Sequence, residues 1–147
     1  MEIRLQPIGI IHSPHHKQGC APVQPRYAQG VRGHLEIFAE FAEGLQDLDG
    51  FSHIMLVYHL HRSRGYSLLT VPHRDTCLRG VFATRSPHRP NPIGISVVRL
   101  LSIENNIVRI SDIDAFDETP LLDIKPFIPE FSSRDEIKLG WIDGKIS

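Results

Sequence analysis

The chain contains little cysteine and no long hydrophobic run, and these shortages narrow the classes of protein to which it can belong. Among its 147 residues, only Cys20 and Cys77 are cysteines, and they stand far apart without a spacing pattern. The sequence therefore indicates neither a disulfide framework nor a thiolate zinc site, and it favours a reducing compartment. No apolar run approaches membrane-spanning length, and residues 1–4 do not begin a signal peptide. We predict a cytoplasmic protein that does not enter a membrane.

Motifs of several enzyme classes are absent as well. The chain has no GxSxG elbow that would expose a nucleophilic serine, and neither cysteine lies in a recognisable activated setting. Ser86 and Ser96 flank a proline-rich loop without an obvious ordered base. Glycine-rich loops that bind phosphates or dinucleotides are also missing, which argues against a Rossmann-type cofactor site.

Short apolar runs, punctuated by glycine and proline, make up much of the chain. Regular short strands predict a mainly β fold, either a barrel or a sandwich, and the length suits one domain over residues 1–147. Residues 40–48 have the pattern of a short helix, and residues 104–106 that of a tight hairpin turn. The predicted strands lie at residues 8–11, 31–38, 54–60, 80–83, 95–103, 107–113 and 121–128.

The most informative pattern lies between two of these runs, at residues 84–96. Three prolines between positions 87 and 92 fix the backbone and remove N–H donors, so the segment cannot join a helix or a sheet ladder. Arg85, His88, Arg89 and Asn91 stand on it. We predict a stiff loop, on a β scaffold, that carries a binding site.

A net charge of −1 hides a segregation of charge along the chain. Residues 59–99 hold seven arginines and one acid, Asp75, whereas residues 104–123 hold six acids and one arginine, Arg109. Arginine outnumbers lysine twelve to four, which favours bidentate contact with phosphate or carboxylate. The alternative is that the arginines pair with the acidic segment as a solvated face.

Nine histidines raise the question of a metal site. In a strand, His53, His59 and His61 would share one side. Met55 and Val57 lie between them on that side, however, and no carboxylate or thiolate completes a ligand set. We therefore predict no metal site and a structural role for His53 and His59, while His61 opens a basic stretch from which it can reach a ligand.

Residues 114–120 form a third polar loop, which leads into a strand with Asp123 and Lys125 on one side. On residue chemistry alone, this segment is an aspartate-initiated turn followed by a solvated pair of charges.

Residues 80–98 and 119–127 strongly resemble the TrmO-like family, also called TsaA-like or YaeB-like. Its members are S-adenosylmethionine-dependent tRNA methyltransferases that act on threonylcarbamoyladenosine beside the anticodon. Residues 7–14, 24–25 and 52–61 extend the resemblance over nearly the whole chain. The resemblance implies a compact, non-Rossmann β-barrel that lacks the C-terminal domain of longer relatives. It also implies a homodimer with the cofactor near the subunit boundary.

The resemblance further implies which residues contact S-adenosylmethionine. Arg85 would hold its carboxylate or its ribose, Ile95 would pack on the adenine, and the acidic turn would favour the positive sulfur and ammonium. The full set of implied cofactor contacts is Gln18, Gly19, Cys20, His61, Arg62, Arg85, Ile95, Glu118, Thr119, Pro120 and Leu121.

For the transfer itself, the acceptor nitrogen lies between a purine ring and a carbamoyl group, so it is a weak nucleophile that must lose its proton. Asp123, His88 or a water would accept that proton. Arg89, Asn91 and Lys125 would grip the anticodon loop, where phosphates supply affinity and an unstacked base supplies specificity.

Two positions depart from the family pattern. Glu118 stands where many relatives have glycine, which adds negative charge and alters the turn, and Val23 replaces a common arginine. These departures leave two alternatives open: a module that binds S-adenosylmethionine or RNA without transfer, or a methyltransferase for another substrate.

Overall fold

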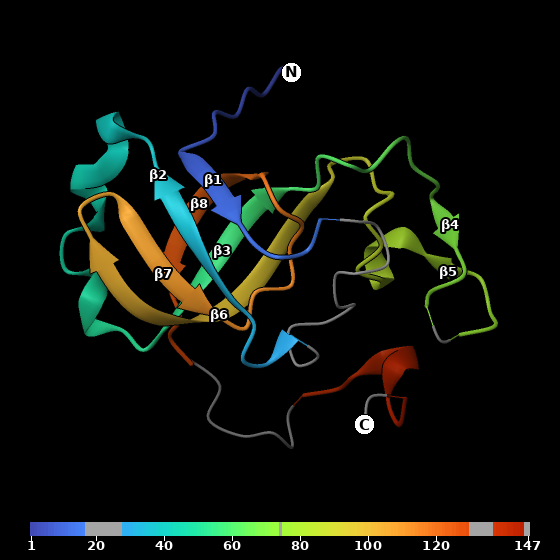
Figure 1. Ribbon diagram of the computed structural model, residues 1–147. Coiled ribbons are helices and arrows are strands. Elements are labelled where there is room, and N and C mark those ends of the chain that lie inside the picture. Colours follow the sequence, from blue (N-terminus) through green and yellow to red (C-terminus); the bar gives the residue numbers. More distant parts are fainter. Residues whose placement is uncertain (17–27, 74, 130–136, 146–147) are drawn as a thin grey trace.

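Six strands form a closed antiparallel barrel in this computed structural model, which describes residues 1–16, 28–73, 75–129 and 137–145 (Figure 1). The strands are β1 Gly9–His12, β2 Arg32–Ile37, β3 His53–His59, β6 Ile93–Glu104, β7 Ile107–Ser111 and β8 Thr119–Pro126. They follow one another around the barrel in the order β1-β2-β7-β6-β3-β8, and β8 pairs with β1 to close it. The expectation of a mainly β, non-Rossmann barrel is confirmed.

The barrel interior is filled by alternate side chains of its strands. In β3, for example, Ile54, Leu56 and Tyr58 are buried while the residues between them face outward, as the two-residue period of a strand requires. Each such aliphatic side chain contributes about 1.5–3 kcal/mol when it is fully buried. The aliphatic side chains that are almost completely inaccessible are Ile11, Leu35, Ile37, Ile54, Leu56, Val98, Val108, Ile110, Ile113 and Leu121.

Two short 3-10 helices cover one end of the barrel (Figure 1). They are η2, Ala39–Leu45, and η3, Leu48–Gly50, and they place Leu45 and its neighbours against the core. The helical pattern at residues 40–48 is therefore confirmed, although the helix is of the tighter 3-10 type. The predicted hairpin turn between β6 and β7 is also confirmed, and Asn105 there takes the left-handed conformation, with φ at 56°.

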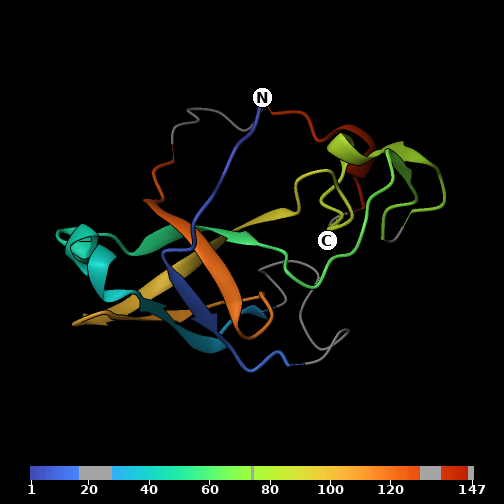
Figure 2. The same cartoon turned by 90° about the horizontal axis from the view of Figure 1, so that it is seen from above.

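Residues 60–73 and 75–92, which we call the arm, project away from the barrel in both views (Figures 1 and 2). The arm carries a two-stranded sheet of β4, Leu69–Thr70, and β5, Arg79–Gly80. It also carries η4, Val81–Ala83, and a further 3-10 helix, η6 Gly140–Ile142, lies beside it. The indole Nε1 of Trp141 donates to the carbonyl of Ala83 at 2.7 Å.

The prediction of a buried strand at residues 80–83 is wrong beyond Gly80. Both the backbone N–H and the hydroxyl of Thr84 bond to the carbonyl of Val81, at 3.1 and 2.8 Å, and this closes a helical turn. As a result Val81 is buried, whereas Phe82 is 76% exposed.

A β-bulge in β8 decides which of its side chains face outward. Asp123 pairs with Val57 and Leu121 with Tyr58, so Leu122 is an extra residue opposite β3. Thr119 and Leu121 are buried ahead of it, but Asp123 and Lys125 lie on the outer face behind it. Their side chains form an exposed ion pair at 2.9 Å.

Candidate functional site

A cavity of about 830 Å³ opens where β3 ends and β6 begins. Its volume lies within the range of about 300–1,000 Å³ that is typical of small-molecule sites. The walls come from β3, β6, the proline-rich loop of the arm and the loop that precedes β8. The lining residues are Met55, Tyr58, Leu60, His61, Arg62, Ser63, Thr84, Arg85, Pro87, His88, Arg89, Asn91, Ile93, Gly94, Ile95, Val97, Asp114, Ala115, Phe116 and Thr119.

One wall of the cavity is apolar. Met55 on β3 and Ile93, Ile95 and Val97 on β6 contribute to it. Ile95 is 55% exposed although it belongs to a long, well-paired strand. An exposed aliphatic surface in a concave site is suited to packing against the flat face of a ligand ring.

The opposite wall is basic, and two of its three arginines are braced by the protein. The Arg89 guanidinium donates to the carbonyls of Thr84 and Ser86 at 2.9 and 3.3 Å, which holds the proline-rich loop together. Arg62 donates to the carbonyl of His16 at 2.8 Å, and its guanidinium lies 4.4 Å from the centre of the Phe116 ring.

Arg85 is the third of these arginines and forms no ion pair with a carboxylate in the part of the chain that the structure describes. Among the arginines of residues 59–99 in that same part, only Arg79 forms an ion pair, and its partner is Asp75. Among the described residues, these arginines therefore do not form ion pairs with the acidic segment at residues 104–123, contrary to the alternative. Arg85 keeps its charge available to a ligand in the cavity.

Two histidines complete the basic side of the cavity. Nδ1 of His88 lies 3.2 Å from the hydroxyl of Ser63, which itself donates to the carbonyl of Pro87 at 2.7 Å. These contacts fasten the proline-rich loop to the chain that leaves β3. Burial, and next the neighbouring Arg62 charge, lower the pKa of His61. His61 therefore faces the cavity mainly as a neutral imidazole.

A chain of three polar side chains runs from the barrel interior to the cavity. The hydroxyl of Tyr58 lies 2.6 Å from that of Ser96, and the Ser96 hydroxyl donates to Oδ1 of Asp114 at 2.6 Å. Burial raises the pKa of Tyr58, and burial also raises the pKa of Asp114. Gly94 is required beside this chain, because a Cβ there would lie 2.4 Å from the Tyr58 ring.

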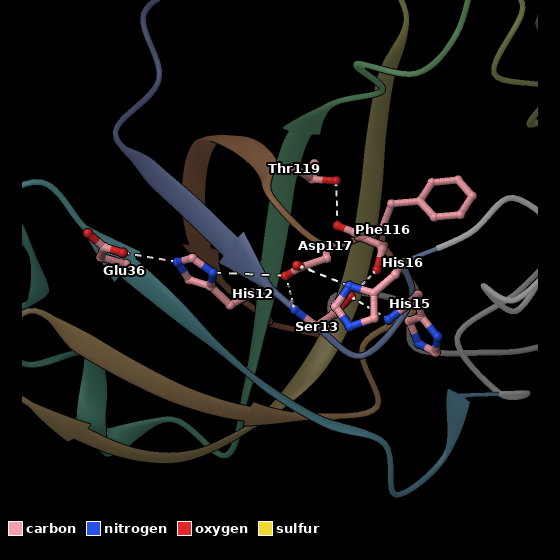
Figure 3. A network of polar contacts seen from close by, with 9 residues as sticks. His12, Ser13, His15, His16, Glu36, Phe116, Asp117 and Thr119 are labelled. Carbon is pink, nitrogen blue, oxygen red and sulfur yellow. Dashed lines mark hydrogen bonds and ion pairs between the residues drawn. The ribbon is translucent and has the colours of Figure 1, made fainter.

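The acidic turn before β8 is fastened to the end of β1 by a polar network (Figure 3). The Asp117 carboxylate accepts the backbone N–H of Ser13 at 2.9 Å and lies 3.3 Å from Nδ1 of His16. The Ser13 hydroxyl donates to the carbonyl of Ala115 at 2.7 Å. Further along, Nε2 of His12 lies 3.0 Å from a Glu36 oxygen. The turn is thus held at the mouth of the cavity.

Glu118 in this turn has a φ of 64°, which is the left-handed region that glycine adopts most easily. A non-glycine residue there costs of order 1–2 kcal/mol. The left-handed conformation is the one that would suit the glycine common at this position in the family, and Glu118 adopts it here. It also leaves the Glu118 side chain exposed.

Of the expected site residues that the structure describes, the cavity gathers most but not all. The expected residues that line it are His61, Arg62, Arg85, His88, Arg89, Asn91, Ile95 and Thr119. Of the others, Leu121 is buried in the core, Pro120 is partly buried, and Glu118 lies on the surface. Asp123 and Lys125 lie on the outer face of the barrel and are not lining residues. Gln18, Gly19, Cys20 and Val23 lie outside the described residues.

Tyr58, Ser96 and Asp114 are the polar groups that sequence reasoning missed at this site. The sequence shows no obvious ordered base for Ser96, but in the fold its side chain is almost fully buried and hydrogen-bonded to both Tyr58 and Asp114. A serine at an inward position of an apolar strand was the available signal. The signal for Asp114, the partner of Ser96, was the apolar residue just before it in the third polar loop, Ile113, which is buried.

Within residues 1–16, 28–73, 75–129 and 137–145, no three His, Cys, Asp or Glu side chains are grouped so that they could hold a metal ion. Over the same ranges, none of the helices combines the length and the apolar character needed to cross a membrane.

Comparison with known proteins gives consistent matches. Residues 10–133 match the family described as the tRNA-methyltransferase O N-terminal domain. A probable S-adenosyl-L-methionine-binding protein of Pyrococcus abyssi is 51% identical over 141 residues, which are 96% of this chain and 77% of that protein. The tRNA (adenine(37)-N6)-methyltransferase of Escherichia coli is 35% identical over 136 residues, covering 86% of this chain and 58% of the enzyme.

A solved structure agrees with these sequence matches. The crystal structure of TrmO from Pseudomonas aeruginosa matches with a TM-score of 0.79 at 39% identity, and the match covers 95% of this chain and 62% of that one. The chain therefore spans less than two thirds of the E. coli enzyme and of the P. aeruginosa protein.

Proposed function

The chain belongs to the tRNA-methyltransferase O N-terminal domain family, and from this we propose that it transfers a methyl group from S-adenosylmethionine to tRNA in the cytoplasm. The proposed acceptor is the exocyclic nitrogen of threonylcarbamoyladenosine next to the anticodon. The observation that carries the proposal is that one cavity is lined by most of the expected site residues that the structure describes.

The cavity suits S-adenosylmethionine in size and in chemistry. This donor combines a purine ring, a ribose, an amino-acid carboxylate and a positively charged sulfur, and the cavity offers about 830 Å³ with one apolar and one basic wall. Ile95 would pack on the purine, and Arg85 would bind the carboxylate or the ribose through its fork of N–H donors. When bound, the donor supplies a methyl group that is already activated by the sulfonium charge.

The contribution of the protein is then to position the two reactants. The proline-rich loop is held by Arg89 and Ser63, and the turn before β8 is held by Asp117 and Ser13. Such preformed walls keep donor and acceptor at reacting distance, and positioning of this kind is worth about 7–11 kcal/mol of a barrier.

We propose that tRNA is held by Arg89, Asn91 and Lys125. Arg89 and Asn91 lie at the cavity, where an unstacked base would enter, while Lys125 is exposed on the outer face of the barrel. Phosphate contacts by Arg89 and Lys125 would supply affinity that falls as the salt concentration rises, and the cavity would supply base specificity.

We also propose that two copies of the chain form a homodimer through the arm. Several large apolar side chains of the arm are exposed, which is unusual for a segment with little core of its own. They are Tyr66, Leu68, Leu69, Val71, Leu78 and Phe82, with exposed fractions of 60%, 60%, 61%, 51%, 64% and 76%. Pairing of two arms would cover this surface beside each cavity.

A second candidate function is binding of S-adenosylmethionine without transfer. The P. abyssi relative is named only as a probable S-adenosyl-L-methionine-binding protein, and Glu118 adds a charge to a turn beside the cavity. The two functions differ in whether the methyl group leaves the donor, which a labelled methyl group can show.

Incubation with donor labelled in its methyl group, and with tRNA that either carries or lacks the threonylcarbamoyl group, tests the proposal. Label in the modified tRNA alone is the expected result. Donor binding without label in either tRNA would support the second candidate function. If the chain neither bound the donor nor transferred label, the assignment of the cavity to S-adenosylmethionine would be wrong.

Arg85→Ala and Arg109→Ala form a matched pair for this experiment. Arg109 is an exposed arginine on β7 that does not line the cavity. Titration calorimetry should show the donor Kd rising at least about tenfold for Arg85→Ala, equivalent to about 1.4 kcal/mol, and little change for Arg109→Ala. Equal effects would contradict the assignment of Arg85.

A further inference from the structure

Among the described residues that line the cavity, Asp114 is the only carboxylate. The other charged or titratable side chains there are three arginines, two histidines and Tyr58. A partly desolvated carboxylate with a specific hydrogen-bond partner in a cavity is a candidate for a functional role.

The hydrogen-bond chain that ends at Asp114 has a fixed direction. A serine hydroxyl carries one proton, and Ser96 gives it to Oδ1 of Asp114. The contact between Tyr58 and Ser96 must therefore be donated by Tyr58. The chain runs from Tyr58 through Ser96 to Asp114, and the hydrogen bond from Ser96 favours the ionised carboxylate against the effect of burial.

The Ser96 hydroxyl occupies Oδ1 of Asp114, and the backbone of Asp114 also bonds to its own carboxylate. An ionised carboxylate has about four acceptor positions, so Asp114 can still accept from a donor in the cavity that it lines. Tyr58 and Ser96 are 6% and 1% exposed, so the supporting chain is shielded from water and orients the carboxylate rigidly.

We propose that Asp114 is the general base that removes the proton of the acceptor nitrogen, with Ser96 and Tyr58 as its positioning residues. This inference rests on the proposed function. The nitrogen uses its electron pair to form the new bond to the methyl carbon, and the carbon–sulfur pair returns to sulfur. The N–H bond then breaks, its electron pair stays on nitrogen, and the proton forms an O–H bond with the Asp114 carboxylate.

The surroundings of Asp114 suit this task. Burial raises the pKa of its carboxyl, while the Ser96 hydrogen bond, a hydrogen bond from the Asp114 backbone and the charges of His15 and Arg85 act in the opposite direction. Tyr58 also faces it, and the raised pKa of that phenol keeps it neutral. A carboxylate whose pKa is raised towards neutrality accepts a proton more readily than an exposed one does.

The two residues predicted as bases from the sequence are less well placed. Asp123 lies outside the cavity and is paired with Lys125. His88 does line the cavity, but it stands exposed on the proline-rich loop with Nδ1 near the Ser63 hydroxyl. Asp123 also accepts the backbone N–H of Ile124 at 2.9 Å, so its carboxylate is engaged on the outer face of the barrel.

Asp114→Asn tests the inference while sparing the fold, because the amide oxygen of asparagine can still accept the Ser96 proton. Single-turnover transfer to modified tRNA should fall by about 10²–10⁴-fold, the usual contribution of a general base. The donor Kd from calorimetry should stay within about threefold, since the interaction lost belongs to the transition state. Asp49→Asn, on exposed η3, is the matched control and should change neither quantity.

A second readout combines the titration of the carboxyl with the pH dependence of the rate. Carbon-13 NMR of labelled aspartate should show one carboxyl, absent in Asp114→Asn, that titrates above the ordinary aspartate range. In the unaltered chain, the transfer rate should fall as the pH drops through that same pKa, because the base must be ionised. The rate profile needs no variant, so it holds even if Asp114→Asn folds poorly.

The outcomes separate the two levels of the proposal. If the chain transfers label and Asp114→Asn transfers it equally fast, this inference alone is overturned. If Asp114→Asn loses donor binding instead of rate, Asp114 binds the donor and is not the base. A larger rate loss in His88→Gln than in Asp114→Asn also overturns the inference. If the unaltered chain transfers no label, the proposed function fails and the inference fails with it.

Discussion

The barrel and the arm place side chains of the same kind in opposite surroundings. Leu56 in the barrel is completely buried, while Leu69 in the arm is 61% exposed. The barrel buries its own apolar surface within one closed sheet, whereas the arm has a two-stranded sheet with two paired residues on each side. The barrel is therefore the source of stability, and the arm is the part whose surface is available to ligands and to another copy.

The two cavities differ in whether the barrel contributes to their walls. The first cavity takes a fixed floor from β3 and β6 and a lid-like wall from the arm. A second cavity, of about 750 Å³, lies between the arm and the C-terminal helix η6 and is lined by Phe82 and Trp141 among others. Four residues of the proline-rich loop line both cavities, namely Thr84, Arg85, Pro87 and His88, and Ser86 lines only the second.

The largest expected effect comes from truncating one leucine in each region. Leu56→Ala removes a fully buried side chain and should lower the free energy of unfolding by about 2–5 kcal/mol. Leu69→Ala removes a mostly exposed one and should change it by less than about 1 kcal/mol. Urea denaturation followed by circular dichroism measures both. Comparable losses would mean that the arm is part of the cooperative core.

A smaller effect is expected on assembly. Replacing Leu78 and Phe82 together with serine should convert the proposed dimer to monomer in sedimentation velocity, because both side chains are exposed on the arm. The matched control is Leu101→Ser, an exposed leucine on the barrel strand β6, which should leave the dimer intact. A monomer in all three proteins would remove the proposed dimer.

The smallest effect concerns the link between the arm and the C-terminal segment. Asp75 accepts hydrogen bonds from Arg79 and Lys145, both at 2.9 Å. The bond from Lys145, and next that from Arg79, hold the pKa of Asp75 below its ordinary 3.8. A lowered pKa means that the link is present above pH 3.8 and is lost as the pH falls below that value.

Trp141, the only tryptophan of the chain, reports on this link by its fluorescence. Asp75→Asn should shift its emission at neutral pH, and the unaltered chain should show a similar shift only in acid. Asp143→Asn replaces an exposed neighbour of Trp141 and should behave like the unaltered chain. An emission spectrum that does not respond to Asp75→Asn would show that other contacts seat the indole.

Most of the barrel could be predicted from the sequence because its strands alternate apolar and polar residues. The failure at residues 80–83 has a local cause: four small or apolar residues resemble a strand, but Thr84 closes them into a turn. No single-residue pattern distinguishes those outcomes, since the decision depends on whether a partner strand is available.

The site was harder to predict, since it depends on register. Thr119, Leu121 and Asp123 have the spacing of a common face, but the extra residue Leu122 turns Asp123 to the other side. Similarly, Tyr58 meets Ser96 only because β3 and β6 pair with Leu56 opposite Ser96. Of the cofactor positions implied by the family resemblance, His61, Arg62, Arg85, Ile95 and Thr119 lie together at the cavity. The buried base candidate became visible only in the folded chain.

The closure of the barrel by β1 and β8 has a consequence for how copies of this chain can meet. Each of the six described barrel strands already has a neighbour on either side, so none offers a free row of N–H and C=O groups. The barrel strands therefore cannot extend their sheet into a second molecule, which is the usual route to fibrous aggregates. Any association between two barrels has to be made by side chains, so single substitutions on the barrel surface can strengthen or weaken it.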